Sequence, residues 1–94
     1  MDKKLQELSQ LKENWDSYGG KPISDLAIAQ AELFLQTFEV IQANRPQIVP
    51  TSIGGLQLEW HQGGFDLEVE ILPSGEVGEV FSSKVDSNDQ KANS

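Results

Sequence analysis

The first part of the chain alternates apolar and polar positions with a helical period. In residues 2–14 the apolar side chains recur every three or four positions, and the same stripe reaches Trp15. This spacing predicts a short amphipathic helix that buries one face. We expect the helix to end in the segment WDSYGG, residues 15–20, because its two glycines permit positive φ angles.

A second helix is predicted from Ser24, a favourable N-cap, to about Ala43. Ile23 and Ile28 have the spacing of a hydrophobic staple around this cap. The apolar side chains of the helix form two faces, one with Ala27, Ala31, Phe34, Phe38 and Ile41, the other with Leu26, Leu33 and Val40. A helix that is apolar on two sides has to be covered on two sides. We expect the sheet to be one cover, and the first helix or a second copy of the protein to be the other.

From residue 47 onward the pattern changes to a period of two, which is typical of strands. QIVPTS is a possible short strand that Pro50 restricts to an edge or a bulge. The alternating segments GLQLEWH and FDLEVEIL are joined through Gly63-Gly64, a turn that pairs Trp60 with Leu67, although a register shifted by two residues keeps the same faces. EVGEVFSS follows as a last strand, in which a possible bulge at Gly78 leaves the inward face undecided.

The order of these elements predicts an α+β fold. Two N-terminal helices pack on one face of a three- to four-stranded antiparallel β-meander, and residues 1–82 form a single domain. Residues 83–94 are polar and aperiodic, so we expect a disordered tail. Trp15 continues the stripe of the first helix and Trp60 lies on the inward sheet face, which allows the two tryptophans to meet in one cluster.

Length and composition limit the possible functions. The 94 residues are enough for one small domain, and they contain neither an apolar run that could span a membrane nor the apolar stretch of a signal peptide. With no cysteine, the chain has no disulfides, no thiol catalysis and no zinc-thiolate site. These features favour the cytoplasm.

The net charge of −8 argues against direct binding to nucleic acid or to anionic membranes. An acidic surface serves solubility in many small domains. A basic protein partner, or mimicry of a nucleic acid, is the alternative interpretation.

The acidic residues concentrate on the outward face of the predicted hairpin. Gln57, Glu59 and His61 stand opposite Asp66, Glu68 and Glu70, and Glu59 directly faces Glu68. Facing carboxylates repel unless water or a cation separates them. Carboxylate pairs also serve glycosidases and metal sites, but an open sheet face offers no cleft that would shift their pKa values. We therefore expect no catalytic residue, no metal and no cofactor, and we name Glu59, Asp66, Glu68 and Glu70 as candidate partner-binding residues.

The segment NWDSYGG, residues 14–20, is interpreted as a corner between the helices. Asp16 and Ser17 can accept hydrogen bonds from nearby backbone N–H groups, and Tyr18 can lay its ring over the corner. Because Trp and Tyr are enriched at interface hot spots, Trp15 and Tyr18 are also candidate partner-binding residues.

Four segments resemble those of a group of small, uncharacterised bacterial proteins. They are NWDSYGG at 14–20, AIAQAELFL at 27–35, RPQIVPTS at 45–52 and GGLQLEW at 54–60, and the similarity covers about residues 5–81. The group shares a Trp-Asp-x-Tyr-Gly corner and a Gly-Gly-x-x-Leu-Glu-Trp strand. The resemblance implies a shared fold and no particular activity.

Together these patterns favour a non-enzymatic, small, acidic protein-interaction module. It would bind a protein partner as an antitoxin-like, immunity or anti-defence regulator. The alternative is a structural or self-associating homodimeric domain with no separate ligand. A hydrolase or metal site on the carboxylate face is the third interpretation.

Overall fold

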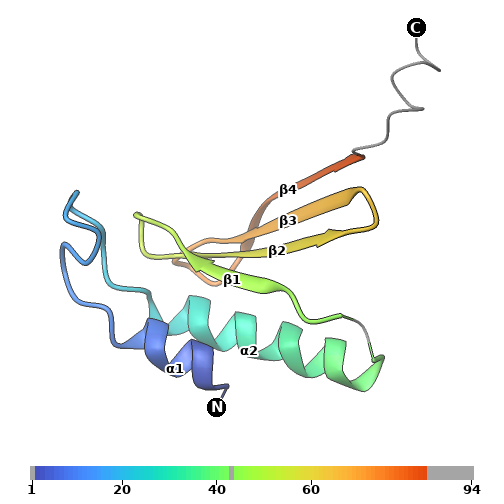
Figure 1. The fold of residues 1–94 in the computed structure, drawn as a ribbon. Helices are drawn as coiled ribbons and strands as arrows, with labels where there is room; N and C mark the ends of the chain where they lie inside the picture. The colour runs from blue at the N-terminus through green and yellow to red at the C-terminus, as the bar shows by residue number, and fades with distance from the viewer. Residues whose placement is uncertain (1, 43, 85–94) are drawn as a thin grey trace, which may run out of the picture.

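The computed structural model describes residues 2–42 and 44–84. These form two helices and four strands, in the order α1 (Lys3–Ser9), α2 (Asp25–Val40), β1 (Gln47–Pro50), β2 (Leu56–Gln62), β3 (Phe65–Ile71) and β4 (Val77–Lys84). All neighbouring strands pair antiparallel in the spatial order β1-β2-β3-β4, with both helices on the same side of the sheet (Figure 1). The predicted α+β class and antiparallel sheet are confirmed.

The start of α2 is the predicted one. The Ser24 hydroxyl oxygen accepts a hydrogen bond from the Ala27 N–H at 3.0 Å, and the hydroxyl donates to the Pro73 carbonyl at 2.6 Å. The second bond ties the helix to the turn between β3 and β4. The helix ends at Val40 rather than near Ala43, because Gln42 turns to a φ of 59°. Ala43 itself lies outside the described residues.

The first helix is shorter than the sequence predicted. It begins after Asp2, whose carboxylate accepts from the Leu5 N–H at 3.1 Å, and it ends at Ser9. Asn14 takes a φ of 65°, and its N–H donates to the Gly20 carbonyl at 2.7 Å. Residues 14–20 therefore close a loop in place of the last turn of the expected helix.

The central hairpin has the preferred predicted register, with Trp60 opposite Leu67 and a turn of two glycines at positive φ. Between β3 and β4, Gly78 and Glu79 together lie opposite Glu70, which is the β-bulge that was considered at Gly78. The bulge puts Val80 on the inner face. β4 continues to Lys84, two residues beyond the expected domain boundary, and residues 85–94 lie outside the described part of the chain.

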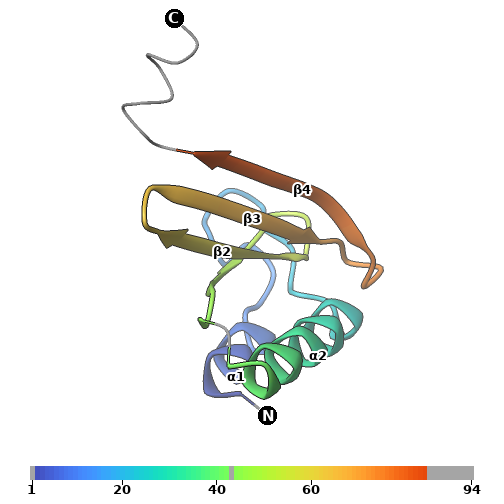
Figure 2. The same ribbon diagram turned by 90° about the vertical axis from the view of Figure 1, so that its right-hand side faces the viewer.

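The core lies between α2 and the inner face of β2 and β3. Leu56, Leu58 and Ile71 of the sheet are fully buried, and Leu5 of α1 joins them. The inner face is not covered evenly, since α2 contacts β2 and β3 while β4 is the strand farthest from the helices (Figure 2). Val80 on this face is 61% exposed.

The expected tryptophan cluster is not formed. Trp15 lies in the corner loop, where its indole N–H donates to the Lys21 carbonyl at 2.7 Å. Trp60 packs edge-on against Phe38 with ring centroids 5.1 Å apart, and its N–H donates to the Asn44 carbonyl at 2.8 Å. The rings are thus at opposite ends of α2. The prediction was wrong because the first helix ends before its stripe reaches Trp15.

Within residues 2–42 and 44–84, neither helix has the length and apolar character needed to cross a membrane.

Candidate functional site

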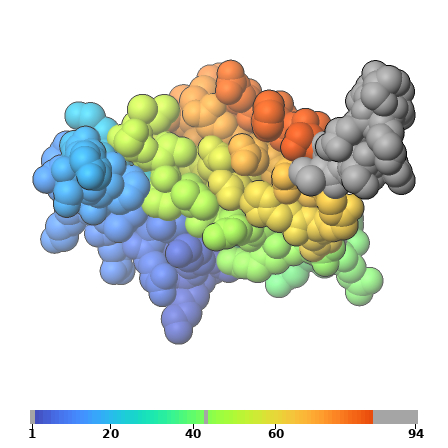
Figure 3. All heavy atoms as spheres, turned by 45° about the horizontal axis from the view of Figure 1, so that its top comes forward, coloured from blue at the N-terminus to red at the C-terminus, as the bar shows by residue number. Residues whose placement is uncertain are grey.

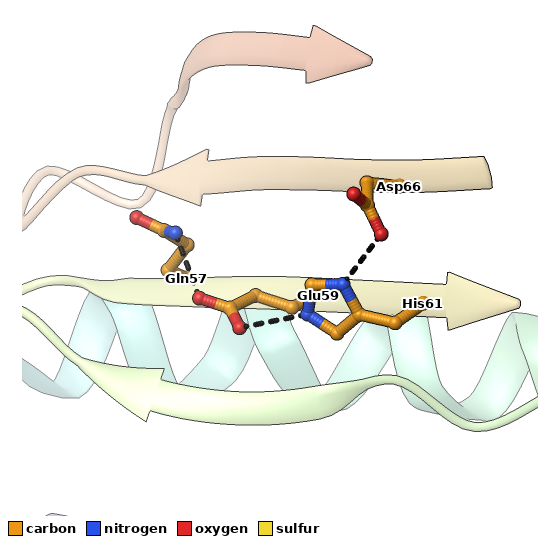
Figure 4. A network of polar contacts seen from close by, with 4 residues as sticks. All are labelled: Gln57, Glu59, His61 and Asp66. Atoms are coloured by element: carbon orange, nitrogen blue, oxygen red, sulfur yellow. Dashed lines mark hydrogen bonds and ion pairs between the residues drawn. The ribbon is translucent and has the colours of Figure 1, made fainter. Parts of the chain in front are cut away.

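The acidic face of the hairpin, formed by Glu59, Asp66, Glu68 and Glu70, contains a hydrogen-bonded network centred on His61 (Figure 4). The Nδ1 atom of His61 lies 2.8 Å from Oδ1 of Asp66, and its Nε2 atom lies 3.3 Å from Oε1 of Glu59. Gln57 donates from Nε2 to the second carboxylate oxygen of Glu59 at 2.8 Å. The imidazole therefore bridges a carboxylate of β2 and one of β3.

This bridge changes the protonation of His61. The hydrogen bond to Asp66, and after it the bond to Glu59, raises the pKa of His61 above its ordinary value. Glu59 lies opposite Glu68 in the register, as predicted, but its side chain turns along its own strand toward Gln57 and His61. Facing carboxylates repel unless water or a cation separates them. The protonated imidazole of His61 can be that cation.

The network does not form a metal site. Its two carboxylates bind opposite nitrogens of one imidazole ring, so the three side chains do not converge on a common point. In the part of the chain that the structure describes, no three His, Cys, Asp or Glu side chains are grouped to hold a metal ion.

The corner between the helices is held by one carboxylate. Oδ1 of Asp16 accepts from the N–H of Tyr18 at 2.9 Å and from that of Gly20 at 2.8 Å. Both bonds lower the pKa of Asp16, and the bond from the Tyr18 N–H has the larger effect. A Cβ atom at the buried Gly20 would lie 2.7 Å from the same oxygen, so the close approach requires a glycine.

Tyr18 does not cover this corner, because the residue is 90% exposed and points into solvent. That expectation was wrong, since backbone bonds to Asp16 and Asn14 hold the loop without an aromatic lid. The corner lies at one end of the molecule and the turn between β2 and β3 near the other (Figure 3). The six candidate residues therefore form two separate groups, four acids on the sheet and two aromatics in the corner.

An apolar groove lies between the C-terminal part of α2 and the inner face of the hairpin. Its volume is about 460 Å³. It is lined by Phe38, Ile41, Trp60, Gln62, Phe65, Leu67 and Val69. Phe65 at its mouth is 42% exposed. This groove was not expected from the sequence, because the periodicity of the same apolar side chains predicted a closed core.

Further apolar residues are exposed on the other apolar face of α2. Leu26 is 61% exposed and Leu33, two turns later, is 58% exposed. Leu26 lies against the turn between β3 and β4, since a Cβ atom at Gly75 would lie 3.3 Å from the Cβ atom of Leu26. We call the groove residues, together with the exposed Leu26, Leu33 and Val80, the open apolar face.

The first helix does not cover the open apolar face. Glu32, Leu35 and Glu39, on another side of α2, border a depression with Asp2 and Arg45, which form an ion pair at 2.9 Å. Because Asp2 caps α1, this is the side of α2 on which α1 packs. Of the two covers expected for the second apolar side of α2, the structure thus excludes α1. The two-sided apolar pattern of the helix was the sequence signal for this surface.

No protein-family model matches the chain, and neither a curated protein nor a solved structure matches it. The resemblance to small bacterial proteins stays a prediction from the sequence.

Proposed function

We propose that this chain is a non-enzymatic protein-interaction module that works by binding other protein surfaces. The observation that carries the proposal is the open apolar face. Soluble monomers rarely expose contiguous apolar patches larger than a few hundred Å², and larger ones mark interaction sites. A groove of about 460 Å³ with a single polar lining residue, Gln62, suits apolar side chains of a protein better than a polar substrate.

The acidic face is proposed as a second contact, for a basic partner protein. Besides the four acids and His61, the strand residues that share this face include Gln47 of β1 and Phe81 of β4, which carry no charge. A cationic surface would pair with Glu68 and Glu70, which the His61 network leaves free of an ion pair among the described residues. Such charges mainly speed association. The alternative contact is the corner, through Trp15 and Tyr18.

In this proposal both helices serve as the packing layer for one side of the sheet, so the other side stays available to a partner. A small acidic module of this kind suits an antitoxin-like, immunity or anti-defence regulator in the cytoplasm, where binding alone inhibits or protects the partner. Its network of carboxylates around His61 supplies no cleft for a hydrolase.

The test begins with capture of partners from an extract of the source cell on the immobilised full chain. Association with each identified partner is then measured for the natural chain, Glu59→Gln/Glu68→Gln and Tyr18→Ala. We expect the double variant to slow association and to reduce its dependence on salt, because exposed charges act beyond contact only over about 8–10 Å. An effect of Tyr18→Ala alone would move the contact to the corner. A chain that binds no protein, its own copies included, would contradict the proposal.

A further inference from the structure

We propose that the open apolar face is covered by a second copy of this chain, in a twofold-symmetric dimer. The inference rests on the proposed function, because it names the occupant of the same surface. Three observations lead to it: the side of α2 that lacks a cover, the distribution of charge and the shape of the face.

The uncovered side of α2 needs a partner from outside the described chain. Leu26 and Leu33 are exposed although their spacing is that of a buried stripe, and α1 lies on a different side of the helix. Among residues 85–94, which lie outside the described part of the chain, the apolar side chains are those of Val85 and Ala92. These two side chains are small beside a groove of about 460 Å³.

The charge distribution favours a second copy over a charged partner. The chain carries a net charge of −8, so two copies repel across most of their surfaces. On α2, however, the acids Asp25, Glu32 and Glu39 recur every seven residues, and the latter two border the α1 side. The remaining acids of the hairpin point from the outer face of the sheet. The open apolar face contains no charged side chain, so two copies can meet here without opposing their carboxylates.

The proposed dimer pairs a ridge with the groove. Leu26 and Leu33 form a ridge two turns long on α2, and Ile41 of the groove lies about 80° around the helix from Leu33. A twofold axis places the ridge of each copy in the groove of the other, which makes both contacts at once. Five large side chains of the face are exposed, namely Leu26, Leu33, Ile41, Phe65 and Val80. At about 100 Å² each they offer roughly 500 Å² per copy, so two copies bury about 1,000 Å², the lower limit for a specific interface.

Sedimentation equilibrium of the full chain, from about 1 to 100 μM, tests this inference. We expect a species of twice the 10.4 kDa chain mass, and added salt should not weaken it. Leu33→Glu should raise the dissociation constant of the dimer at least about 100-fold, because the interface would bury two unpaired carboxylates. Gln36→Glu adds the same charge to the exposed α1 side of the same helix and should change the constant by less than about twofold.

Circular dichroism shows whether each variant keeps its fold. If Leu33→Glu does not fold, Leu33→Ala replaces it and is expected to weaken the dimer about tenfold. A natural chain that stays monomeric at about 100 μM would overturn the inference, and so would equal effects of Leu33→Glu and Gln36→Glu. A monomer that binds a different protein, with loss of that binding in Leu33→Glu, would overturn the dimer and leave the proposed function standing.

Discussion

At the scale of single residues, His61 makes the stability of the fold depend on pH. Its pKa is raised in the folded chain by Asp66 first and Glu59 second, so the folded state holds the proton more tightly than the unfolded state. Protonated His61 contributes its full stabilisation below about pH 6.5, which is the ordinary pKa of histidine. This stabilisation is lost as the pH rises through the raised pKa of His61 in the folded state. We therefore predict that the free energy of unfolding falls with rising pH in this window.

Urea unfolding at a series of pH values measures this fall, and His61→Gln is the control. Because His61 is the only histidine of the chain, the substitution should flatten the profile near neutral pH. An unchanged profile in the variant would show that the imidazole does not bridge the two carboxylates in solution.

Leu58 is the residue whose truncation should be most costly in the sheet. It is fully buried in the core, and Leu58→Ala should lower the free energy of unfolding by about 2–5 kcal/mol through the cavity it leaves. Val40→Ala, at a position that is 82% exposed, should change it by less than about 0.5 kcal/mol. Equal effects in denaturant unfolding would mean that the strand buries its other face.

At the scale of elements, the outer face of β2 and β3 distinguishes two glutamates that the register places opposite each other. Glu59 accepts a hydrogen bond from Gln57 and lies beside His61, whereas Glu68 has no ion pair within the described ranges. Glu68→Gln should therefore raise the free energy of unfolding by about 0.2–1 kcal/mol, because it removes the facing charge. Glu59→Gln should give no such gain, since it also removes a partner of His61. Thermal unfolding of the two single variants measures this difference. Equal effects of the two substitutions would mean that water alone solvates both carboxylates.

The elements that could be predicted are those fixed by local chemistry. The Ser24 cap, the two-glycine turn and the alternation of Leu56, Leu58 and Trp60 determine the start of α2 and the register of the hairpin within a few residues. The end of α1 could not be predicted, because it depends on backbone bonds that Asn14 and Gly20 make across a closed loop. The inward direction of Val80 likewise depends on a bulge that only the paired strand defines.

In the molecule as a whole, the helical layer is narrower than the sheet that it covers. A helix is about 10 Å across and strands are about 4.8 Å apart, so α2 spans roughly two strands of a four-stranded sheet. Since α1 lies beside α2 toward β1, the half of the inner face near β4 remains open. Periodicity identified which side chains face inward, but it does not say how far a helix covers them. For this reason the apolar groove was not expected, although Trp60 was correctly placed on the inner face.

The proposed function requires that another protein surface covers the open apolar face. The chain contains no cysteine, so a single thiol can report on one position at a time. Leu33→Cys places the thiol on the face, and Gln36→Cys places a matched thiol on the other side of the same helix. We propose to measure the labelling rate of each variant by a water-soluble thiol reagent, in dilute solution, in concentrated solution and in extract of the source cell.

We expect both thiols to react at similar rates in dilute solution, and the thiol of Leu33→Cys alone to become protected as the protein is concentrated. Protection only in the extract would indicate a different protein as the occupant. Equal labelling of the two variants under all three conditions would contradict the claim that this face is a binding surface.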